Sequence, residues 1–482
     1  MDNVILVEAL RALIYVLLIA PGVVIMFIHS VIFFTGRSPR AADPTPATHV
    51  GGSGHGVSIV IPVKNEPEHI IVELVENLGE GLKESSLDYE IIIISDDPPD
   101  SVAGVKRRCE DLALRLGLKN FRFIVRTEGP KGRAGALNYG VLNSAHDLLL
   151  FLDADSRLER TTIPELISCV ESGYDACVGR WAGYTYRNTK LGLALLLSMK
   201  YVVDTLYRGR FNAGLMIFPL GTGTIYRKDA LLKAGLWEPD VIQDDMYMGA
   251  KLHSMGYTIG FTEKAVVRVS VPSSLKAFIL QQCRWSYGAI ETLRKGYVRH
   301  TLRRVAVKDL LKAVEGLVFF LQYLPLAGLA LSLLLIPALS LILRDDIMNL
   351  NPYPLVIFGL TLFAYGLSIY KSIRELSLPR IRILRSMGSI AAFSTTISPY
   401  ILHHSLKALL NNKIVYVVTP KGSREYNIGG PSGMVLFSAY LTFMVVANLL
   451  LSNYYTSLWL LTFIVATAYT LLNAEKAPAL TP

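Results

Sequence analysis

Two aspartates follow an apolar segment in the order FLDADS, and their spacing could support metal or phosphate chemistry. Asp153 and Asp155 come directly after Leu148–Leu152, which has the pattern of a buried strand. In an extended chain, residues two apart point the same way, so we expect both carboxylates to face one spot. Hard oxygen ligands of this kind suit a Mg²⁺ or Mn²⁺ ion that also binds phosphate oxygens. A pair of turn residues is the alternative interpretation of the same motif.

Three further polar groups follow apolar segments and could bind a phosphate, a ribose or a base. Asp96 and Asp97 come after Ile91–Ile94, although Asp-Asp-Pro-Pro is also an ordinary turn sequence. The segment Lys64–Glu66 after the first apolar run is ambiguous in the same way. Lys131–Arg133 supplies cations and a glycine suited to a pyrophosphate, while surface solvation explains these residues as readily.

A second aspartate pair, Asp244 and Asp245, begins an expected helix that carries Met248, Leu252 and Met255. Carboxylates in the first turn of a helix often cap it and complement its dipole. The alternative is a base placed to take a proton from a sugar hydroxyl.

The segment QQCRW combines three side chains that could recognise a phosphorylated sugar. Gln281 and Arg284 are three residues apart and therefore share one face of a helix, and Trp285 is adjacent. Arg284 could clamp phosphate and Trp285 could stack on a sugar. An Arg-Trp belt at a membrane interface is the alternative.

Apolar strands alternate with amphipathic helices in the part of the chain that must position these residues. The expected strands are Val57–Val63, Ile91–Ile94, Phe121–Val125 and Leu148–Leu152, and the expected helices are about Glu68–Leu82, Val102–Leu116 and Gly135–Ser144. This alternation predicts a mostly parallel sheet with helices on both faces. Ligands of such sheets bind beyond the carboxyl ends of the strands, which is where the polar groups lie.

The composition indicates that other parts of the chain are embedded in a membrane. Of 482 residues, 51% are hydrophobic and 18% are charged, with a mean hydropathy of +0.39. Five segments are long and apolar enough to cross a hydrocarbon core of about 30 Å: Ala12–Phe34, Leu317–Leu343, Tyr353–Tyr370, Gly433–Leu451 and Tyr454–Leu472. We expect the first to be a retained anchor, because the apolar core of a signal peptide spans only about 7–15 residues.

One further apolar stretch, Gly388–Leu410, is interrupted by His403, His404 and Lys407, so we expect it to lie at the membrane interface. The net charge of +9 is concentrated in two stretches that border apolar segments, 284–312 and 371–428. Basic loops on the cytoplasmic face explain this pattern better than nucleic-acid binding does. The charge pattern predicts a multi-pass protein of the cell membrane with its amino terminus outside and its α/β domain in the cytoplasm.

The four cysteines form no C-x-x-C pair, so neither a zinc site nor a dithiol redox motif is expected. Four cysteines are also too few for a disulfide scaffold in a chain of this length. We expect them to be in a reducing compartment.

No single motif identifies a family, but the motifs taken together in their order resemble one. The set VSIVIPVKNEP, IIIISDD, KGRAGALNYG, FLDADS, FPLGTGTIYRKDAL, QDD and QQCRW resembles glycosyltransferase family 2, in the branch of cellulose, chitin and hyaluronan synthases. The segment Tyr416–Lys421 looks like the F-V-T-K gating-loop motif of that branch, and the resemblance covers about residues 57–425. A compact version of this architecture resembles archaeal membrane mannosyltransferases that act on lipid-linked glycans.

The resemblance implies a GT-A fold, a Rossmann-like α/β domain with a mostly parallel sheet, attached to an α-helical transmembrane domain. It implies that Asp245, with Asp244, is catalytic, that Asp155 and Asp153 hold Mg²⁺ or Mn²⁺, and that Trp285 contacts the acceptor. The residues implied to bind the nucleotide sugar are Pro62, Lys64, Glu66, Asp96, Arg133, Asp153, Gln281, Arg284 and Lys421. Three positions differ from the family pattern and bear on donor choice and loop gating: Gln243-Asp244-Asp245 replaces T-E-D, Arg133 replaces the Lys of K-A-G, and Tyr416 replaces the gating-loop Phe.

We therefore expect an inverting, metal-dependent hexosyltransferase. The favoured donor is GDP-mannose, followed by UDP-glucose or UDP-N-acetylglucosamine, and the expected acceptor is a lipid-linked glycan or a glycolipid. A processive polysaccharide synthase is the alternative function. A transporter and an inactive nucleotide-sugar sensor are more remote, because the apolar spans contain essentially no ionisable groups and Asp153, Asp155 and Asp245 are all present.

The expected domain boundaries follow from these assignments. They are a transmembrane helix at 1–36, a linker at 37–56, the GT-A domain at 57–275, interface helices with the QxxRW motif at 276–312, two transmembrane helices at 313–372, an interface helix and gating-loop-like segment at 373–430, and two transmembrane helices at 431–482.

Overall fold

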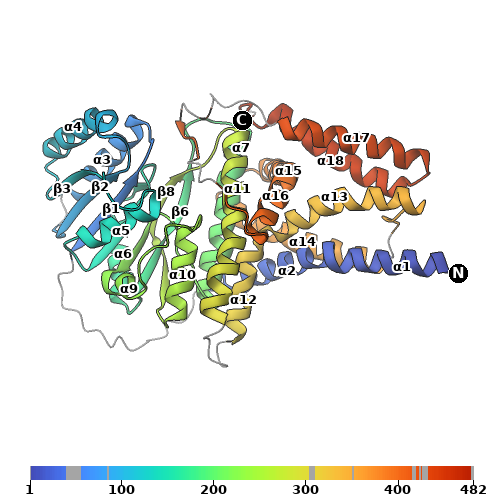
Figure 1. Ribbon diagram of the computed structural model, residues 1–482, viewed down its shortest axis with the longest axis horizontal. Coiled ribbons are helices and arrows are strands. Elements are labelled where there is room, and N and C mark those ends of the chain that lie inside the picture. The colour runs from blue at the N-terminus through green and yellow to red at the C-terminus, as the bar shows by residue number, and fades with distance from the viewer. Residues whose placement is uncertain are drawn as a thin grey trace.

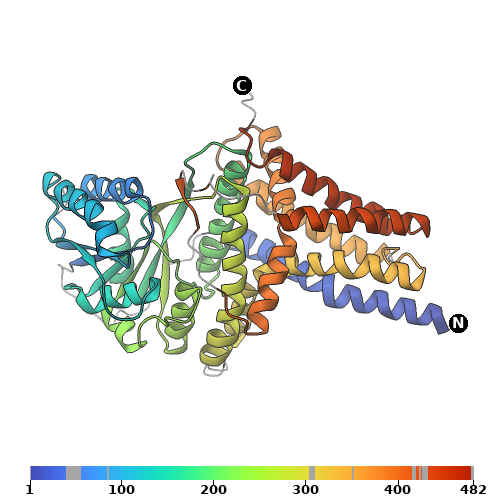
Figure 2. The same ribbon diagram turned by 45° about the horizontal axis from the view of Figure 1, so that its top comes forward.

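The computed structural model describes residues 2–38, 56–83, 86–302, 310–349, 352–414, 419–422, 425 and 432–478. Figure 1 shows an α/β domain at one end and a bundle of roughly parallel helices at the other. Long helices stand between these two parts and run across the direction of the bundle, and the view in Figure 2 shows the same arrangement.

One eight-stranded sheet forms the centre of the α/β domain, in the order β3-β2-β1-β4-β7-β6-β8-β5. The strands are β1 (Val57–Val63), β2 (Tyr89–Ser95), β3 (Phe121–Val125), β4 (Leu148–Phe151), β5 (Arg157–Leu158), β6 (Ala176–Tyr184), β7 (Thr224–Arg227) and β8 (Ile259–Ser270). Strands β3, β2, β1 and β4 are parallel to one another, and β6 is parallel to β8. Strand β7 is antiparallel to both of its neighbours, β4 and β6, and β5 is antiparallel to β8. The mostly parallel GT-A-like sheet predicted from the sequence is confirmed.

The sheet separates two apolar cores, because neighbouring residues of a strand point to opposite faces. In β1, Ile59 and Ile61 join one core while Val60 joins the other. The first core is covered by α3 (Glu68–Leu82), α4 (Pro99–Arg115) and α6 (Thr162–Glu171), and the second by α5 (Arg133–Asn143), α9 (Lys228–Lys233) and α10 (Asp244–Ser254). Burial on both faces explains why these strands are continuous apolar runs in the sequence.

Two of the four cysteines form a disulfide, which the sequence-based expectation of a reducing environment did not anticipate. Cys169 on α6 and Cys177 on β6 are bonded, with their Cα atoms 6.1 Å apart. They come together because the chain turns back between α6 and β6, and sequence spacing alone does not reveal that turn. Cys109 and Cys283 are buried free thiols.

Helices α7 (Lys190–Val203), α11 (Leu275–Thr292) and α12 (Leu310–Phe320) connect the α/β domain to the bundle. The π-helical segment η3 (Leu293–Leu302) continues α11, and η2 (Asp204–Gly209) with α8 (Arg210–Asn212) continues α7. Phe319 and Phe320 of α12 are part of the second core of the α/β domain. The connecting helices are therefore part of the same packed body as the sheet.

The described residues contain five candidate membrane spans, at the places where the sequence predicted them. They are Val7–Thr35, Leu310–Leu343, Tyr353–Arg374, Gly433–Leu450 and Tyr454–Asn473. The corresponding helices are α1 (Asp2–Ile14), η1 (Tyr15–Ile19) and α2 (Ala20–Thr35), then α13 (Leu324–Leu343), α14 (Pro352–Arg374), α17 (Ser432–Leu450) and α18 (Tyr454–Asn473). Large apolar side chains such as Leu17, Phe363 and Leu436 are exposed on the bundle, as a lipid environment requires.

Two helical regions differ in detail from the expected spans. The predicted span Leu317–Leu343 bends at Leu321–Tyr323, because α12 packs along the α/β domain while α13 alone runs with the bundle. The 20 residues of α13 are about 30 Å long at 1.5 Å per residue, enough to cross a membrane. The stretch Gly388–Leu410 falls in two helices, α15 (Arg380–Thr396) and α16 (Ser398–Leu409), and neither is a candidate span.

Candidate active site

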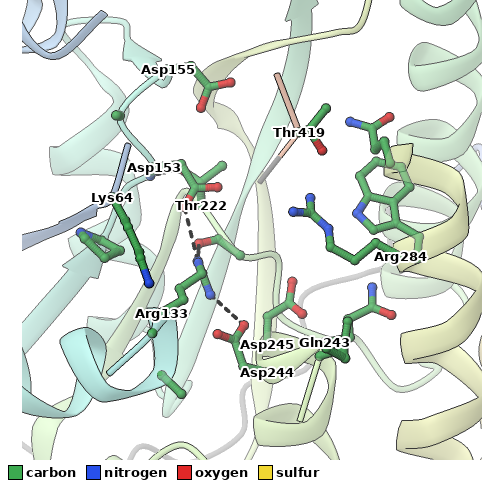
Figure 3. Close-up of a pocket in the computed structure, with 18 of the residues that line it drawn as sticks. Lys64, Arg133, Asp153, Asp155, Thr222, Gln243, Asp244, Asp245, Arg284 and Thr419 are labelled. Atoms are coloured by element: carbon green, nitrogen blue, oxygen red, sulfur yellow. Dashed lines mark hydrogen bonds and ion pairs between the residues drawn. The ribbon is translucent and has the colours of Figure 1, made fainter. Parts of the chain in front are cut away.

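A cavity of about 900 Å³ lies at the carboxyl ends of β1, β2 and β4 and is lined on its other side by residues of α11. Every site residue predicted from the sequence lines it: Pro62, Lys64, Glu66, Asp96, Arg133, Asp153, Asp155, Asp244, Asp245, Gln281, Arg284, Trp285 and Lys421. Figure 3 shows the aspartates and Arg133 facing Arg284 across this space. Residues more than 350 positions apart in the chain therefore share one site, although their individual roles remain predictions.

The expected reason for the closeness of Asp153 and Asp155 is wrong, although both lie in the cavity. Strand β4 ends at Phe151, and the Ser156 backbone N–H donates to the Asp153 carbonyl oxygen at 3.0 Å, which closes a turn. The two carboxylates consequently meet different cations. Asp153 accepts from Arg133 at 3.3 Å and Asp155 accepts from Lys421 at 2.9 Å.

The oxygen ligands on this turn fit a Mg²⁺ or Mn²⁺ ion that is shared with a substrate. Within the described ranges, no group of three or more His, Cys, Asp or Glu side chains could hold a metal. An ion bound through one or two carboxylates is completed by phosphate oxygens and water, which is the usual arrangement for Mg²⁺ at nucleotides. Asp153 and Asp155 match that pattern better than they match a permanent protein cage.

Arg133 ties the two aspartate pairs together at the start of α5. Its Nη1 donates to Asp244 Oδ1 at 2.5 Å, and its Nη2 donates to Asp153 and to the Gly221 carbonyl oxygen. A Cβ atom at Gly221 would lie 3.2 Å from Arg133 Nη2 and 3.2 Å from Asp245 Oδ2. A side chain at position 221 would therefore crowd both groups, which gives the glycine in FPLGTG a physical reason.

Asp245 is the second member of the pair that begins α10. It lies in the first turn of α10, is half-buried, and accepts the Met246 backbone N–H at 2.8 Å. Burial, reinforced by the negative charge of Asp244, raises the pKa of Asp245 to about 7. A carboxylate with this pKa can take up and release a proton near neutral pH.

Asp96, predicted to bind the nucleoside, forms a buried ion pair that sequence reasoning missed. Arg126 Nε donates to Asp96 Oδ1 at 2.9 Å and Nη2 donates to Oδ2 at 2.8 Å, and both side chains are at most 3% exposed. The Gly132 backbone N–H also donates to Asp96 Oδ2 at 2.7 Å. This pair fixes the carboxyl end of β2 against the Lys131–Arg133 loop. The sequence does contain a hint of this pair, because Arg126 directly follows β3 and residues that follow parallel strands lie at the same edge of the sheet.

Helix α11 presents the QxxRW residues to the cavity. Figure 3 shows the Arg284 side chain reaching from α11 into the space that Asp153 and Arg133 face. Ser274 caps α11, and its hydroxyl accepts the Ala277 N–H at 3.3 Å. The Glu425 carboxylate, which the sequence analysis missed, accepts the backbone N–H groups of Ser273 and Ser274 at 2.8 and 2.9 Å.

Lys421, from the gating-loop-like segment, is held deep in the site. Its ammonium group donates to Glu66 and to Asp155, each at 2.9 Å, and these two carboxylates raise the pKa of Lys421. Thr419 and Pro420 also line the cavity. Tyr416, the position that differs from the family pattern, lies outside the described residues.

Sequence reasoning also missed two residues that shape the cavity wall. The indole Nε1 of Trp181 on β6 donates to the Thr222 carbonyl oxygen at 2.9 Å. The Thr222 hydroxyl accepts the Asp153 backbone N–H at 3.0 Å and so supports the turn after β4. No local pattern marks either residue, because their importance comes from the neighbours that the sheet gives them.

Comparison with protein families matches the chain to two domain descriptions. Residues 58–235 match glycosyl transferase family 2, and residues 148–369 match glycosyl transferase family group 2. The two matches together span residues 58–369, which is more than half of the chain and includes most of the cavity wall. Residues 58–369 thus resemble glycosyltransferase family 2 domains.

Two similar proteins are a glycosyltransferase and a polysaccharide synthase. A probable glycosyltransferase of Sulfolobus acidocaldarius is 28% identical over 437 residues, which cover 87% of this chain and 89% of the relative. A poly-beta-1,6-N-acetyl-D-glucosamine synthase of Staphylococcus aureus is 26% identical over 245 residues, and the match spans 50% of this chain and only 56% of the synthase.

Among solved structures, the chain resembles a mannosyltransferase from Pyrobaculum calidifontis in complex with GDP-Man and Mn²⁺. The TM-score is 0.51 at 16% identity, and the match covers 84% of this chain and all of that one. At this identity the likeness supports the GT-A fold. The described part of the chain therefore combines a GT-A-like domain with five candidate membrane spans.

Proposed function

We propose that this protein is a membrane-bound, inverting, metal-dependent hexosyltransferase that transfers a sugar from a nucleotide donor to a lipid-linked glycan or a glycolipid. GDP-mannose is the first donor to test, followed by UDP-glucose and UDP-N-acetylglucosamine. The observation that carries the proposal is the single cavity in which Asp245, the Asp153–Asp155 turn and Arg284 face one another.

Asp245 acts as the base in this proposal. Its carboxylate takes the proton of an acceptor hydroxyl while the hydroxyl oxygen attacks the anomeric carbon of the donor sugar. The bond between that carbon and the diphosphate oxygen breaks, and the nucleoside diphosphate leaves with the electron pair. Attack opposite to the leaving group inverts the anomeric configuration. The raised pKa of Asp245 suits this role near neutral pH.

The diphosphate is held by cations on both sides of the cavity. Arg133 and Arg284 supply guanidinium groups, and Asp153 and Asp155 would hold a Mg²⁺ or Mn²⁺ ion. When bound, that ion supplies positive charge that stabilises the departing diphosphate. Asp244 keeps Arg133 in place through their ion pair. Pro62, Lys64, Glu66 and Asp96 line the nucleotide side, where Lys421 is bonded to Glu66, and Gln281 and Trp285 line the side of α11.

A lipid-linked acceptor is supported by the helix that leads to the cavity rim. Helix α16 packs against both α11 and the span α13. Leu406, Leu409 and Leu410 at its exposed side are 44–68% exposed, and Lys413 and Ile414, which follow, line the cavity. Exposed apolar side chains thus lie between a helix that packs on a candidate span and the residues at the cavity, which suits an acceptor whose tail stays in the bilayer.

A processive polysaccharide synthase is the second candidate, because half of this chain matches a poly-beta-1,6-N-acetyl-D-glucosamine synthase. Among the described residues, none of those lining the cavity belongs to a candidate span. This favours single transfer at the membrane surface over export of a growing chain through the bundle. Product length on a size-separation gel distinguishes the two functions.

The proposal is tested with the full-length protein in lipid nanodiscs, incubated with a panel of nucleotide sugars, Mn²⁺ and extracted membrane lipids. Release of a nucleoside diphosphate together with a labelled, solvent-extractable product is expected for one donor. EDTA should abolish the release and added Mn²⁺ should restore it. Turnover that is insensitive to EDTA would refute the metal dependence, and no turnover with any donor would refute the proposed function.

A further inference from the structure

The Lys421 ammonium group is a cation enclosed by carboxylates that come from two distant parts of the chain. It lies 2.9 Å from Glu66 Oε1, after β1, and 2.9 Å from Asp155 Oδ1, after β4. The three side chains are 16%, 9% and 11% exposed, so solvent screens their charges little. Two buried carboxylates that converge on one point require a cation at that point, because breaking such a pair leaves an uncompensated charge.

Asp155 is also the residue that the proposed function assigns to the divalent metal. A metal ion and an ammonium group need the same carboxylate oxygen atoms, and two cations cannot share one position in a buried site. We propose that Lys421 occupies the divalent-metal position, that the metal displaces it, and that Glu66 is a metal ligand together with Asp155. This inference rests on the metal dependence in the proposed function; it pairs Glu66 with Asp155 at the ion and makes Lys421 a competitor of the metal.

The segment that carries Lys421 is anchored in a way that allows this exchange. Glu425, four residues further on, is 3% exposed and is bonded to Ser273 and Ser274 at the start of α11. The anchor does not involve Glu66 or Asp155. Lys421 can therefore leave the carboxylates while Glu425 keeps the segment beside the cavity, where the displaced ammonium group can meet a diphosphate.

Metal binding without any nucleotide sugar tests the inference directly. Mn²⁺ is titrated into the full-length protein in zwitterionic nanodiscs, and the free ion is measured by electron paramagnetic resonance against empty nanodiscs. Lys421→Met should tighten Mn²⁺ binding on the order of ten- to a hundredfold, because the metal no longer has to break a buried ion pair before it binds. Adding Glu66→Gln to that variant should reverse the gain.

Lys413→Met is the matched control, because Lys413 lines the same cavity and carries the same charge but is exposed. The Mn²⁺ affinity of this variant should stay within about twofold of wild type, because solvent screens the charge of an exposed lysine. An unchanged affinity in Lys421→Met, or an equal gain in both lysine variants, would overturn the inference. A gain that persists after Glu66→Gln would remove Glu66 from the metal site.

A second measurement uses the wild-type protein and does not depend on the folding of a variant. Reductive methylation of Lys421, read by mass spectrometry, should increase when Mn²⁺ saturates the site, because the displaced amine becomes accessible. If the extent of Lys421 methylation were the same with and without saturating Mn²⁺, displacement of Lys421 by the metal would be contradicted. The donor panel reports on the proposed function separately, so turnover without Mn²⁺-dependent methylation would refute only the exchange of Lys421 for metal.

Discussion

At the scale of single residues, the site separates two adjacent aspartates by their partners. Asp244 is paired with Arg133 at 2.5 Å, whereas Asp245 accepts the Met246 backbone N–H and faces the cavity. Burial, followed by repulsion from the negative charge of Asp244, raises the pKa of Asp245. This arrangement gives one carboxylate that holds Arg133 in place and one that faces the cavity with a raised pKa.

Asp245→Asn should reduce the rate of sugar transfer by at least about 10²-fold, the effect typical of losing a general base. Donor affinity should change little, because the amide keeps the size of the side chain while losing only the proton acceptor. Single-turnover kinetics and calorimetry with the donor measure the two quantities. Asp240→Asn, at an exposed position of the same cavity, is the control. A variant at position 245 that retains a tenth of the wild-type rate would place the base elsewhere.

The pH dependence of transfer should show an acid limb near the pKa of Asp245, about 7. The base works only when deprotonated, so activity is present above this pKa and is lost as the pH falls through it. Asp244→Asn removes the repelling charge and should move the acid limb to lower pH. The profile of kcat against pH for the two proteins checks this, and an acid limb that stays in place would show that another group titrates.

At the scale of elements, the start of α11 is held by two carboxylates from distant segments. Glu425 accepts from Ser273 and Ser274, and Glu475, after the last span, accepts the Leu275 N–H at 3.0 Å. Carboxylates at this end also complement the helix dipole. The position of Arg284 on α11 therefore depends on the gating-loop-like segment and on the chain that leaves α18.

Glu425→Ala should destabilise the protein by about 1–3 kcal/mol, the cost of leaving buried donors without an acceptor. The affected donors are the N–H groups of Ser273 and Ser274 and the Ser273 hydroxyl. Thermal unfolding in nanodiscs measures the loss, and limited proteolysis near residue 421 should become faster. Glu128→Ala, at an exposed position, should have no such effect. Equal stability of the two variants would contradict an anchoring role for Glu425.

At the scale of the whole molecule, ion pairs join the α/β domain to the helical bundle. Glu375, just after α14, accepts from Lys200 at 2.7 Å and Arg208 at 3.4 Å on the α7–η2 side, and from Arg37 after α2 at 2.9 Å. Far from this junction, Arg11 on α1 donates to Asp345 after α13 at 2.8 Å. The bundle and the catalytic domain are thus fastened to each other rather than linked by the chain alone.

The charge pattern predicts that the loop after α13 is outside and the α/β domain is inside the cell. Single cysteines at Asn349 and at Lys119, both exposed, test this in sealed right-side-out vesicles. An impermeant thiol reagent should label Asn349→Cys at once and Lys119→Cys only after permeabilisation. The background should be low, because Cys109 and Cys283 are buried and the other two cysteines are bonded. Immediate labelling at position 119 would invert the topology.

The elements and the membership of the site could be predicted from the order of residues along the chain. Strand β1 and helix α3 have the predicted bounds, because their apolar residues recur with the period of a strand or a helix over a few neighbours. Polar residues directly after parallel strands must meet at one edge of the sheet, so the sequence was enough to place Asp96, Asp153 and Lys64 in one site.

The pairing of the charges, in contrast, is a property of the folded chain alone. Lys421 pairs with Asp155, 266 positions away in the chain, and Arg126 pairs with Asp96. Cys169 is bonded to Cys177 where the chain turns back. The turn at Asp153 and the bend between α12 and α13 likewise depend on what packs beside them. Local periodicity reports only on neighbours in the chain, whereas an ion pair between distant segments depends on the path of everything that lies between them.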